Sequence, residues 1–191
     1  MLADIPKIIL ASGSPRRKEL LLMAGFNFEV RVKNTDETHP SNALPKDIPA
    51  LLAERKALAF FDEIKDEIII AADTIVIIEN MILEKPNTRE EAIAMLQLLS
   101  GKRHDVVTGV CILTKEKKMI FSEQTAVFFN VLSLEEIVFY VDKFKPYDKA
   151  GGYACQEWIG AIGIARFDGS YHNVVGLPTA TLYQKLKNFQ D

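Results

Sequence analysis

A single carboxylate interrupts the most apolar stretch of the sequence. Asp73 lies within the run IIIAADTIVII (68–78), whose abundance of isoleucine predicts a central β-strand. Because an isolated buried charge is very costly, this carboxylate must face a cleft or be buried with partners. One interpretation is a structural aspartate that accepts hydrogen bonds from backbone amides at a bulge. The other is a metal ligand or general base, since apolar surroundings tune the pKa of a carboxyl group.

Two arginines, Arg16 and Arg17, lie where a helix is expected to disfavour them. The surrounding sequence, SGSPRRKELLLMAG, predicts a helix whose positive dipole end lies beside both side chains. The residues that define this helix are Ser14 as the N-cap, Pro15 as the first helical residue, Leu20, Leu21 and Met23 as an apolar stripe, and Gly25 as the stop. Each arginine should cost the helix a few tenths of a kcal/mol.

A bound phosphate would explain this arrangement. A helix N-terminus presents N–H groups and a positive dipole to an anion, and arginines add bidentate, charge-assisted hydrogen bonds. We therefore expect Ser12, Ser14 and Arg17 to contact phosphate, although the loop lacks the glycine-lysine ending of a Walker A sequence. On physical grounds alone, a solvated basic helix start accounts for the pattern equally well.

The remaining charged residues form an acidic and a basic set at predicted loops and strand ends, where ligands bind in open α/β sheets. Taken singly, each is typical of a solvated surface. The members are Lys56 in AERKA, Lys85 in LEKP, Asp36, Glu37 and His39 in the loop TDETH, and Asp148 and Lys149 in DKAGGY.

The composition indicates an ordinary globular protein. Of 191 residues, 48% are hydrophobic and 26% charged, and the net charge of −3 argues against a stable nucleic-acid partner or an anionic membrane surface. Cys111 and Cys155 have neither metal-ligand spacing nor a disulfide framework, which is typical of a reducing compartment. The N-terminal sequence is too short and interrupted for a signal peptide or membrane span, so we expect a cytoplasmic protein.

Strand and helix patterns alternate along the chain and predict a mixed α/β fold in a single domain spanning 1–191. The expected strands are 7–11, 26–32 and 66–80, followed by two long antiparallel strands, DVVTGVCILTK and MIFSEQTAVFFNVL, and a hairpin of IGIARF and YHNVV around Asp168-Gly169. The expected helices, besides the first, are 48–64, 88–101 with a capping box of Thr88 and Glu91, one from Ser133 and Glu136 to about Val141, and 178–189.

Several motifs together resemble the Maf family of nucleotide pyrophosphatases. They are LASGSPRRKELL, AADTIVI, LEKP, LSGKRHDVVTGV, YDKAGGYACQ and DGSYHNVVGLP, which follow the family's order and spacing from Ile8 to Pro178. The resemblance implies a central twisted mixed β-sheet flanked by helices, related to the inosine triphosphate pyrophosphatases, and often a homodimer. It also implies hydrolysis of a nucleoside triphosphate to the monophosphate and pyrophosphate with a divalent metal, Mg or Mn.

The resemblance also assigns roles by motif. Asp73 matches the catalytic proton acceptor, and Glu37, by its place in the acidic loop, is expected to bind the metal together with Asp73. The remaining matches are Arg16, Thr74 and Gln156 at positions associated with base selectivity, and Arg17, Lys56 and Lys85 at basic positions near the triphosphate.

The sequence YDKAGGYACQ resembles the branch that prefers dTTP and UTP. The departure from the branch pattern is Glu157, which replaces a glycine after Gln156 and adds bulk and charge beside the expected base pocket. Two alternatives stay open. One is a pyrophosphatase for other or modified nucleotides, such as CTP or 7-methyl-GTP. The other is a non-enzymatic nucleotide- or nucleic-acid-binding regulator of cell division, which the negative net charge disfavours.

Overall fold

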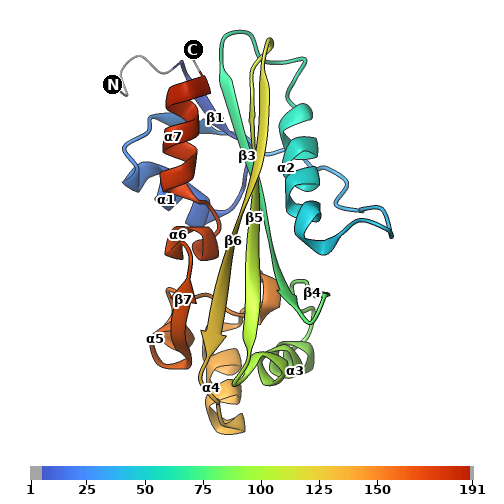
Figure 1. Ribbon diagram of the computed structural model, residues 1–191, viewed down its shortest axis with the longest axis vertical. Helices are drawn as coiled ribbons and strands as arrows, with labels where there is room; N and C mark the ends of the chain where they lie inside the picture. Colours follow the sequence, from blue (N-terminus) through green and yellow to red (C-terminus); the bar gives the residue numbers. More distant parts are fainter. Residues whose placement is uncertain (1–5, 190–191) are drawn as a thin grey trace. The chain divides into compact units, whose positions relative to one another are not determined.

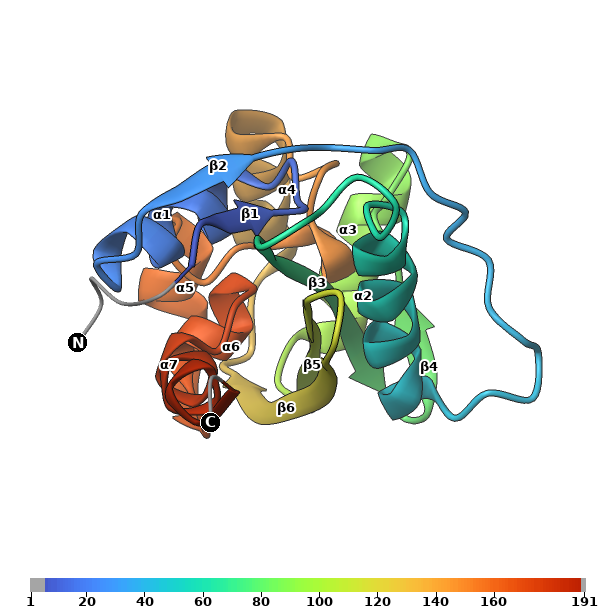
Figure 2. The same cartoon turned by 90° about the horizontal axis from the view of Figure 1, so that it is seen from above.

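The computed structural model describes residues 6–189, which group into two compact units (Figures 1 and 2). Each unit is built from separate stretches of the chain. Unit 1 takes its described residues from Met1–Asp73, Thr108–Glu123 and Gly176–Asp191, and unit 2 comprises Thr74–Val107 and Gln124–Val175.

Within the described residues, seven strands form one sheet in the order β2-β1-β3-β5-β6-β7, and β4 pairs with β3. The strands are β1 Ile8–Leu10, β2 Phe28–Val30, β3 Ile68–Ile78, β4 Met81–Leu83, β5 Arg103–Leu113, β6 Lys118–Phe129 and β7 Ile164–Asp168. β1 pairs in parallel with β2 and β3, whereas β4 and β7 pair antiparallel to their neighbours. The sheet is therefore mixed, as predicted.

Helices flank this sheet, and most of their buried residues are apolar. The helices are α1 Pro15–Met23, α2 Ile48–Leu58, α3 Arg89–Leu99, α4 Leu134–Phe144, α5 Trp158–Gly163, α6 Tyr171–Val175 and α7 Thr179–Phe189, with the 3₁₀ helices η1 Pro45–Asp47 and η2 Ala150–Gly152. No helix within residues 6–189 combines the length and apolarity needed to cross a membrane.

In unit 1, α2 packs directly on β5. Ala53 and Phe60 lie in a buried cluster with Ile69 of β3 and Cys111 of β5. A Cβ atom added at Gly109 would lie 2.2 Å from the backbone of Pro49 and Ala50, so only glycine allows this approach. α2 and the pair α1 and α7 lie on opposite sides of the unit 1 strands (Figures 1 and 2). The residues of α2 are thereby fixed relative to β3 and β5.

In unit 2, α3 and α4 pack on a second buried cluster that includes Val76, Leu96 and Tyr140. α4 begins with the predicted capping box, in which the side chains of Ser133 and Glu136 each accept a hydrogen bond from the other residue's backbone N–H.

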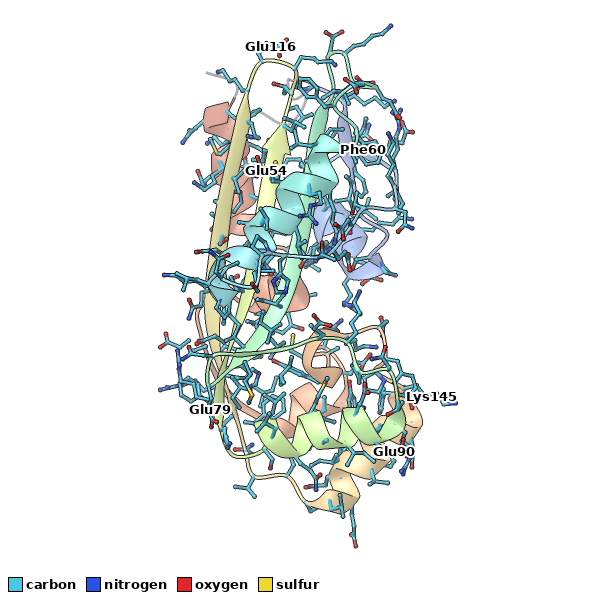
Figure 3. All side chains as sticks on the ribbon, turned by 90° about the vertical axis from the view of Figure 1, so that its right-hand side faces the viewer. Glu54, Phe60, Glu79, Glu90, Glu116 and Lys145 are labelled. Carbon is cyan, nitrogen blue, oxygen red and sulfur yellow. The ribbon has the colours of Figure 1, made fainter. Side chains whose placement is uncertain are left out.

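Two tight turns connect neighbouring strands of the sheet. Glu116 lies in the turn between β5 and β6, and Glu79 lies in the turn between β3 and β4, with φ of 51° (Figure 3).

Several local predictions were wrong. Met23 is 72% exposed, so the apolar stripe of α1 consists of Leu20 and Leu21 alone. The Thr88 side chain caps α3 as expected, but Glu91 accepts the N–H of Asn87, which leaves the capping box incomplete. α2 also ends at Leu58 rather than at residue 64, because the N–H groups of Phe60, Phe61 and Glu63 donate to carbonyls three positions back, as in successive turns and not as in an α-helix.

The predicted second strand of the C-terminal hairpin, YHNVV, is instead the short helix α6. The side chain of Asn173 explains the difference, because it is buried and donates to the Val106 carbonyl at 3.1 Å and to Thr125 Oγ1 at 3.0 Å. Its backbone N–H donates to Ser170 Oγ at 3.2 Å, which closes a turn that a strand cannot make. Gly169 permits the turn, since a Cβ there would lie 2.7 Å from Thr125 Oγ1.

Candidate active site

The start of α1 places Ser12, Ser14 and Arg17 together. Ser14 is the extended N-cap residue, and its N–H donates to Ser12 Oγ at 3.3 Å. Arg17 donates from Nη1 to the same Ser12 oxygen at 3.2 Å and from Nε to the Gly176 carbonyl at 2.9 Å. The guanidinium is thus fixed at the N-terminal end of a helix, where the N–H groups of the first turn favour an anion.

Charges of both signs act on Arg17. Burial lowers the pKa of its guanidinium, the nearby Asp73 carboxylate raises it, Arg16 lowers it and Glu37 raises it. The structure therefore brings two predicted phosphate contacts, Ser12 and Arg17, into the same electrostatic environment as Asp73 and Glu37.

Asp73 has a charged partner. Its Oδ1 atom accepts a hydrogen bond from Lys56 Nζ at 2.6 Å, and the two side chains are 14% and 18% exposed. The buried cluster beneath α2 holds Lys56 opposite β3, which explains why a lysine from a helix reaches a carboxylate on a strand. Burial with a partner was one of the two alternatives predicted for Asp73, but the sequence did not identify Lys56 as that partner.

Glu37 completes a bridge of charges. Lys56 Nζ lies 2.7 Å from Glu37 Oε1 as well as 2.6 Å from Asp73 Oδ1, so both carboxylates converge on one cationic nitrogen. Two carboxylates that already share a cation are a suitable donor set for Mg²⁺, which takes its other ligands from water and substrate phosphate. Among residues 6–189, no group of three or more His, Cys, Asp or Glu side chains forms a metal cluster. The fit therefore rests on this pair.

Three predicted site residues belong to unit 2. Thr74 directly follows Asp73 in β3 and is half-buried, whereas Lys85 and Gln156 are exposed. The LEKP and DKAGGY motifs lie together, because the Gly151 N–H donates to the Glu84 carbonyl at 3.0 Å. Gly151 has φ of +69°, a conformation that favours glycine.

The segment that carries Gln156 is anchored by residues that the sequence did not single out as a group. The Tyr140 hydroxyl accepts the Ala154 N–H at 3.2 Å and donates to Glu157 Oε2. Glu157 Oε1 lies 3.4 Å from Lys149 Nζ, which also donates to Asp148 Oδ1 at 2.6 Å. Burial and the Glu157 contact raise the pKa of Tyr140, which keeps it a hydrogen-bond donor. Glu157, predicted to alter the loop, is therefore one of its anchors.

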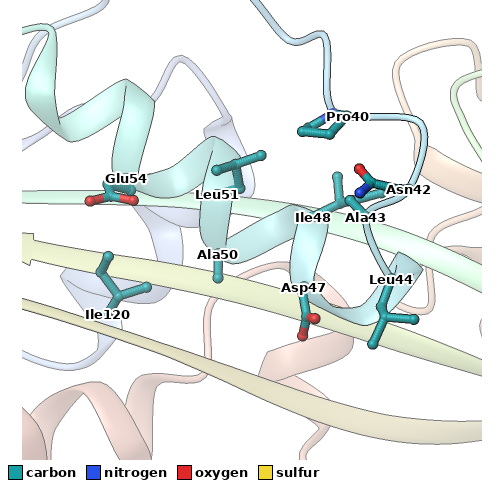
Figure 4. A pocket seen from close by; sticks show the side chains of 10 residues that line it. All are labelled: Pro40, Asn42, Ala43, Leu44, Asp47, Ile48, Ala50, Leu51, Glu54 and Ile120. Carbon is teal, nitrogen blue, oxygen red and sulfur yellow. The ribbon is translucent and has the colours of Figure 1, made fainter.

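A separate pocket of about 510 Å³ lies on another face of α2 in unit 1 (Figure 4). Its lining consists of Pro40, Asn42, Ala43, Leu44, Asp47, Ile48, Ala50, Leu51, Glu54 and Ile120. None of the predicted site residues contributes to it. Its Glu54 carboxylate is paired with Lys118 at 2.5 Å.

Known proteins similar to this chain belong to the family that its motifs resemble. A family model described as "Maf-like protein" matches residues 7–189. A protein of Parabacteroides distasonis named dTTP/UTP pyrophosphatase is 51% identical over 185 residues, covering 96% of each chain. Proteins with the same name from Bacteroides fragilis (strain YCH46) and Flavobacterium psychrophilum are 47% and 48% identical, covering 98% and 95% of this chain and 99% and 94% of their own.

A solved structure supports the fold alone. The Ham1 protein of Staphylococcus aureus superimposes with a TM-score of 0.51 at 16% identity, covering 94% of this chain and 99% of its own. The mixed sheet flanked by helices is therefore confirmed, and the chain belongs to the Maf family.

Proposed function

We propose that this protein is a nucleoside triphosphate pyrophosphatase that hydrolyses dTTP and UTP to the monophosphate and pyrophosphate. The observation that carries the proposal is the convergence of Asp73 and Glu37 on Lys56 in the unit that also holds Arg17 at a helix N-terminus. The name dTTP/UTP pyrophosphatase, borne by relatives 47–51% identical over nearly the full chain, supports the same activity.

Asp73 is proposed to be the general base. Its carboxylate would accept a proton from the water that attacks the bond between the α and β phosphates, and no covalent nucleophile is required. Its pairing with Lys56 holds it in one orientation and keeps a cation beside the developing negative charge.

The positive charges have a complementary task. We infer that Ser12, Ser14, Arg17, Lys56 and Lys85 bind the phosphates, which the charge-assisted hydrogen bonds of arginine and lysine favour. Glu37 and Asp73 would hold a divalent cation, Mg²⁺ or Mn²⁺, which would neutralise phosphate charge when bound.

Base selectivity is assigned to Arg16, Thr74 and Gln156. A uracil or thymine edge presents an acceptor, a donor and an acceptor in turn, and a glutamine amide, with one donor and one acceptor, can meet two of them. Cytosine would leave groups mismatched, at about 1–3 kcal/mol for each unsatisfied group. We further propose that residues 1–191 work as one pyrophosphatase domain, as a homodimer in the cytoplasm, with free nucleotides rather than nucleic acid as ligands.

Pyrophosphate release over a nucleotide panel tests the proposal. With Mg²⁺ or Mn²⁺ fixed, specificity constants for dTTP and UTP are expected to exceed those for CTP, GTP, ATP and 7-methyl-GTP. A preference for CTP or 7-methyl-GTP would assign the enzyme another substrate and implicate Glu157. If no nucleotide released pyrophosphate, the alternative of a non-enzymatic binding protein would hold instead.

A further inference from the structure

Arg55 holds the backbone on both sides of Glu37. This arginine lies on α2, immediately before Lys56, and its Nη1 atom donates to the carbonyl of Asp36 at 2.6 Å and to the carbonyl of Thr38 at 2.7 Å. A charged donor shared by two carbonyls two positions apart fixes the curvature of the chain between them. The backbone at Glu37 is therefore held by a side chain from the helix.

The loop closes on itself around this contact. Asp36 accepts the Thr38 N–H at 2.8 Å on one oxygen and the Thr38 hydroxyl at 2.7 Å on the other. Arg55 Nη1 lies 3.6 Å from the Asp36 carboxylate, farther than from either carbonyl. The carbonyl contacts are thus the shorter ones and lie within hydrogen-bond distance, whereas the loop carboxylate serves mainly to close the turn.

Arg55 and Lys56, which are neighbours on α2, contact different parts of this loop. Successive residues of an α-helix point about 100° apart, so Arg55 and Lys56 reach different parts of the same loop. Arg55 holds the backbone, and Lys56 Nζ meets the Glu37 carboxylate at 2.7 Å. The Glu37 side chain is 58% exposed, so packing restrains it little and its place depends on the backbone that carries it.

We propose that Arg55 is a positioning residue that holds residues 36–38 so that the Glu37 carboxylate converges with Asp73 on one cation. The part of this inference that concerns a metal rests on the proposed function. The part that concerns the loop rests on the hydrogen bonds alone.

Hydrogen exchange of the protein without metal or nucleotide tests the loop directly. The variants are Arg55→Ala and Arg55→Met, of which the second keeps the aliphatic stem but has no donor. Exchange of the Thr38 amide, in a peptide covering residues 34–44, is expected to quicken about tenfold in both. Exchange in residues 68–78 should stay unchanged, which separates loop opening from general unfolding.

Arg31→Ala is the matched control. Arg31 also lies in unit 1, but its guanidinium donates to the Glu29 side chain at 2.8 Å rather than to loop carbonyls. Its loss should leave exchange at Thr38 unchanged. Equal exchange at Thr38 in the wild type and both Arg55 variants would overturn the inference.

Mn²⁺ binding, followed by electron paramagnetic resonance of the free ion, tests the consequence for Glu37 without catalysis. Both Arg55 variants should bind Mn²⁺ about tenfold more weakly, and the metal concentration for half-maximal UTP hydrolysis should rise in parallel. Quickened loop exchange with unchanged Mn²⁺ affinity would refute the positioning role. A wild-type protein that releases no pyrophosphate would refute the proposed function, while exchange and Mn²⁺ binding would still decide the role of Arg55.

Discussion

Lys56 and Asp73 form an ion pair between a helix and a strand, with Nζ and Oδ1 2.6 Å apart and both side chains largely buried. Truncating one member of such a pair leaves the other as an uncompensated charge, so the two residues depend on each other. A variant at Asp73 can therefore lose activity because the carboxylate is missing or because the unpaired lysine disturbs the fold. A substitution that keeps shape and hydrogen bonding is therefore preferred at Asp73.

Asp73→Asn should lower turnover of dTTP by about 10²–10⁴-fold, because an amide cannot act as a general base. The amide oxygen can still accept the Lys56 hydrogen bond, so the fold should be retained. Pyrophosphate release measures the first effect, and circular dichroism measures the second. A folded variant with near-normal turnover would show that Asp73 is structural.

Arg17→Ala should weaken both substrate binding and the fold. The variant loses hydrogen bonds to Ser12 and to the Gly176 carbonyl, and bonds from a charged donor contribute about 1.5–3 kcal/mol each to stability. We expect a higher KM for dTTP and a lower free energy of unfolding, measured in urea. Arg17→Lys keeps the charge, so its KM for dTTP should lie between those of the wild type and the alanine variant. An unchanged KM in the alanine variant would exclude a phosphate contact.

Gly109→Ala should destabilise unit 1 by about 1–3 kcal/mol, since overpacking of a close contact forces the backbone to shift. The new Cβ atom would lie 2.2 Å from the backbone of Pro49 and Ala50. Gly13→Ala is the control for stability, because its Cβ would meet only the two Val32 methyl groups, at 3.6 and 3.9 Å. Equal melting temperatures for the two variants would show that α2 can shift away from β5 at little cost in free energy.

Stability should fall as the solution becomes acidic, through His104. The side chain is 1% exposed, Nε2 pairs with the Tyr153 hydroxyl at 2.7 Å and, among the described residues, Nδ1 has no hydrogen-bond partner. Burial, and to a lesser extent Arg103, lowers its pKa from 6.5 to about 3.

The native protein therefore keeps His104 neutral, while the unfolded chain takes up a proton below pH 6.5. The contribution of His104 is complete above that pH and is lost between about 6.5 and 3, at up to about 1.4 kcal/mol per pH unit. Urea unfolding at pH 7, 6 and 5 measures the slope. His104→Phe should have a shallower slope, and equal slopes would refute the assignment. Glu29, whose pKa is lowered by Arg31 and Lys7 from 4.5 to about 2, loses its contribution only between those two pH values, below the range of pH 7 to 5 used here.

Glu157→Gly restores the glycine of the dTTP/UTP branch but removes the contacts to Tyr140 and Lys149. We expect about a tenfold loss in kcat/KM for UTP and a smaller ratio between UTP and CTP, because the segment carrying Gln156 loses an anchor. Tyr140→Phe should change that ratio in the same direction, since it deletes the hydroxyl that joins Ala154 to Glu157. An unchanged ratio in both variants would mean that Glu157 has no part in selectivity.

The sequence predicts what depends on periodicity and on local motifs. β3, the capped start of α4 and the Pro15 start of α1 are set by residues close together in the chain. Contacts between distant residues have no such signal. Lys56 and Asp73 are 17 positions apart, and Tyr140 and Glu157 are also 17 apart, on different elements whose packing decides which polar groups meet. α6 was missed because its buried asparagine gains partners from two strands, which overrides the strand propensity of its valines.

The bond from Arg17 to the Gly176 carbonyl spans 159 positions of the chain. During synthesis, the N-terminal helix therefore leaves the ribosome long before its acceptor exists. Unit 1 also takes a segment from Gly176 onward, so this piece is translated after the whole of unit 2. Closing so long a loop is slow, because the conformational entropy of the intervening chain must be lost before the contact forms. A nascent chain consequently carries Arg17 without its native anchor until Gly176 has been translated, and chains truncated before Gly176 never acquire it.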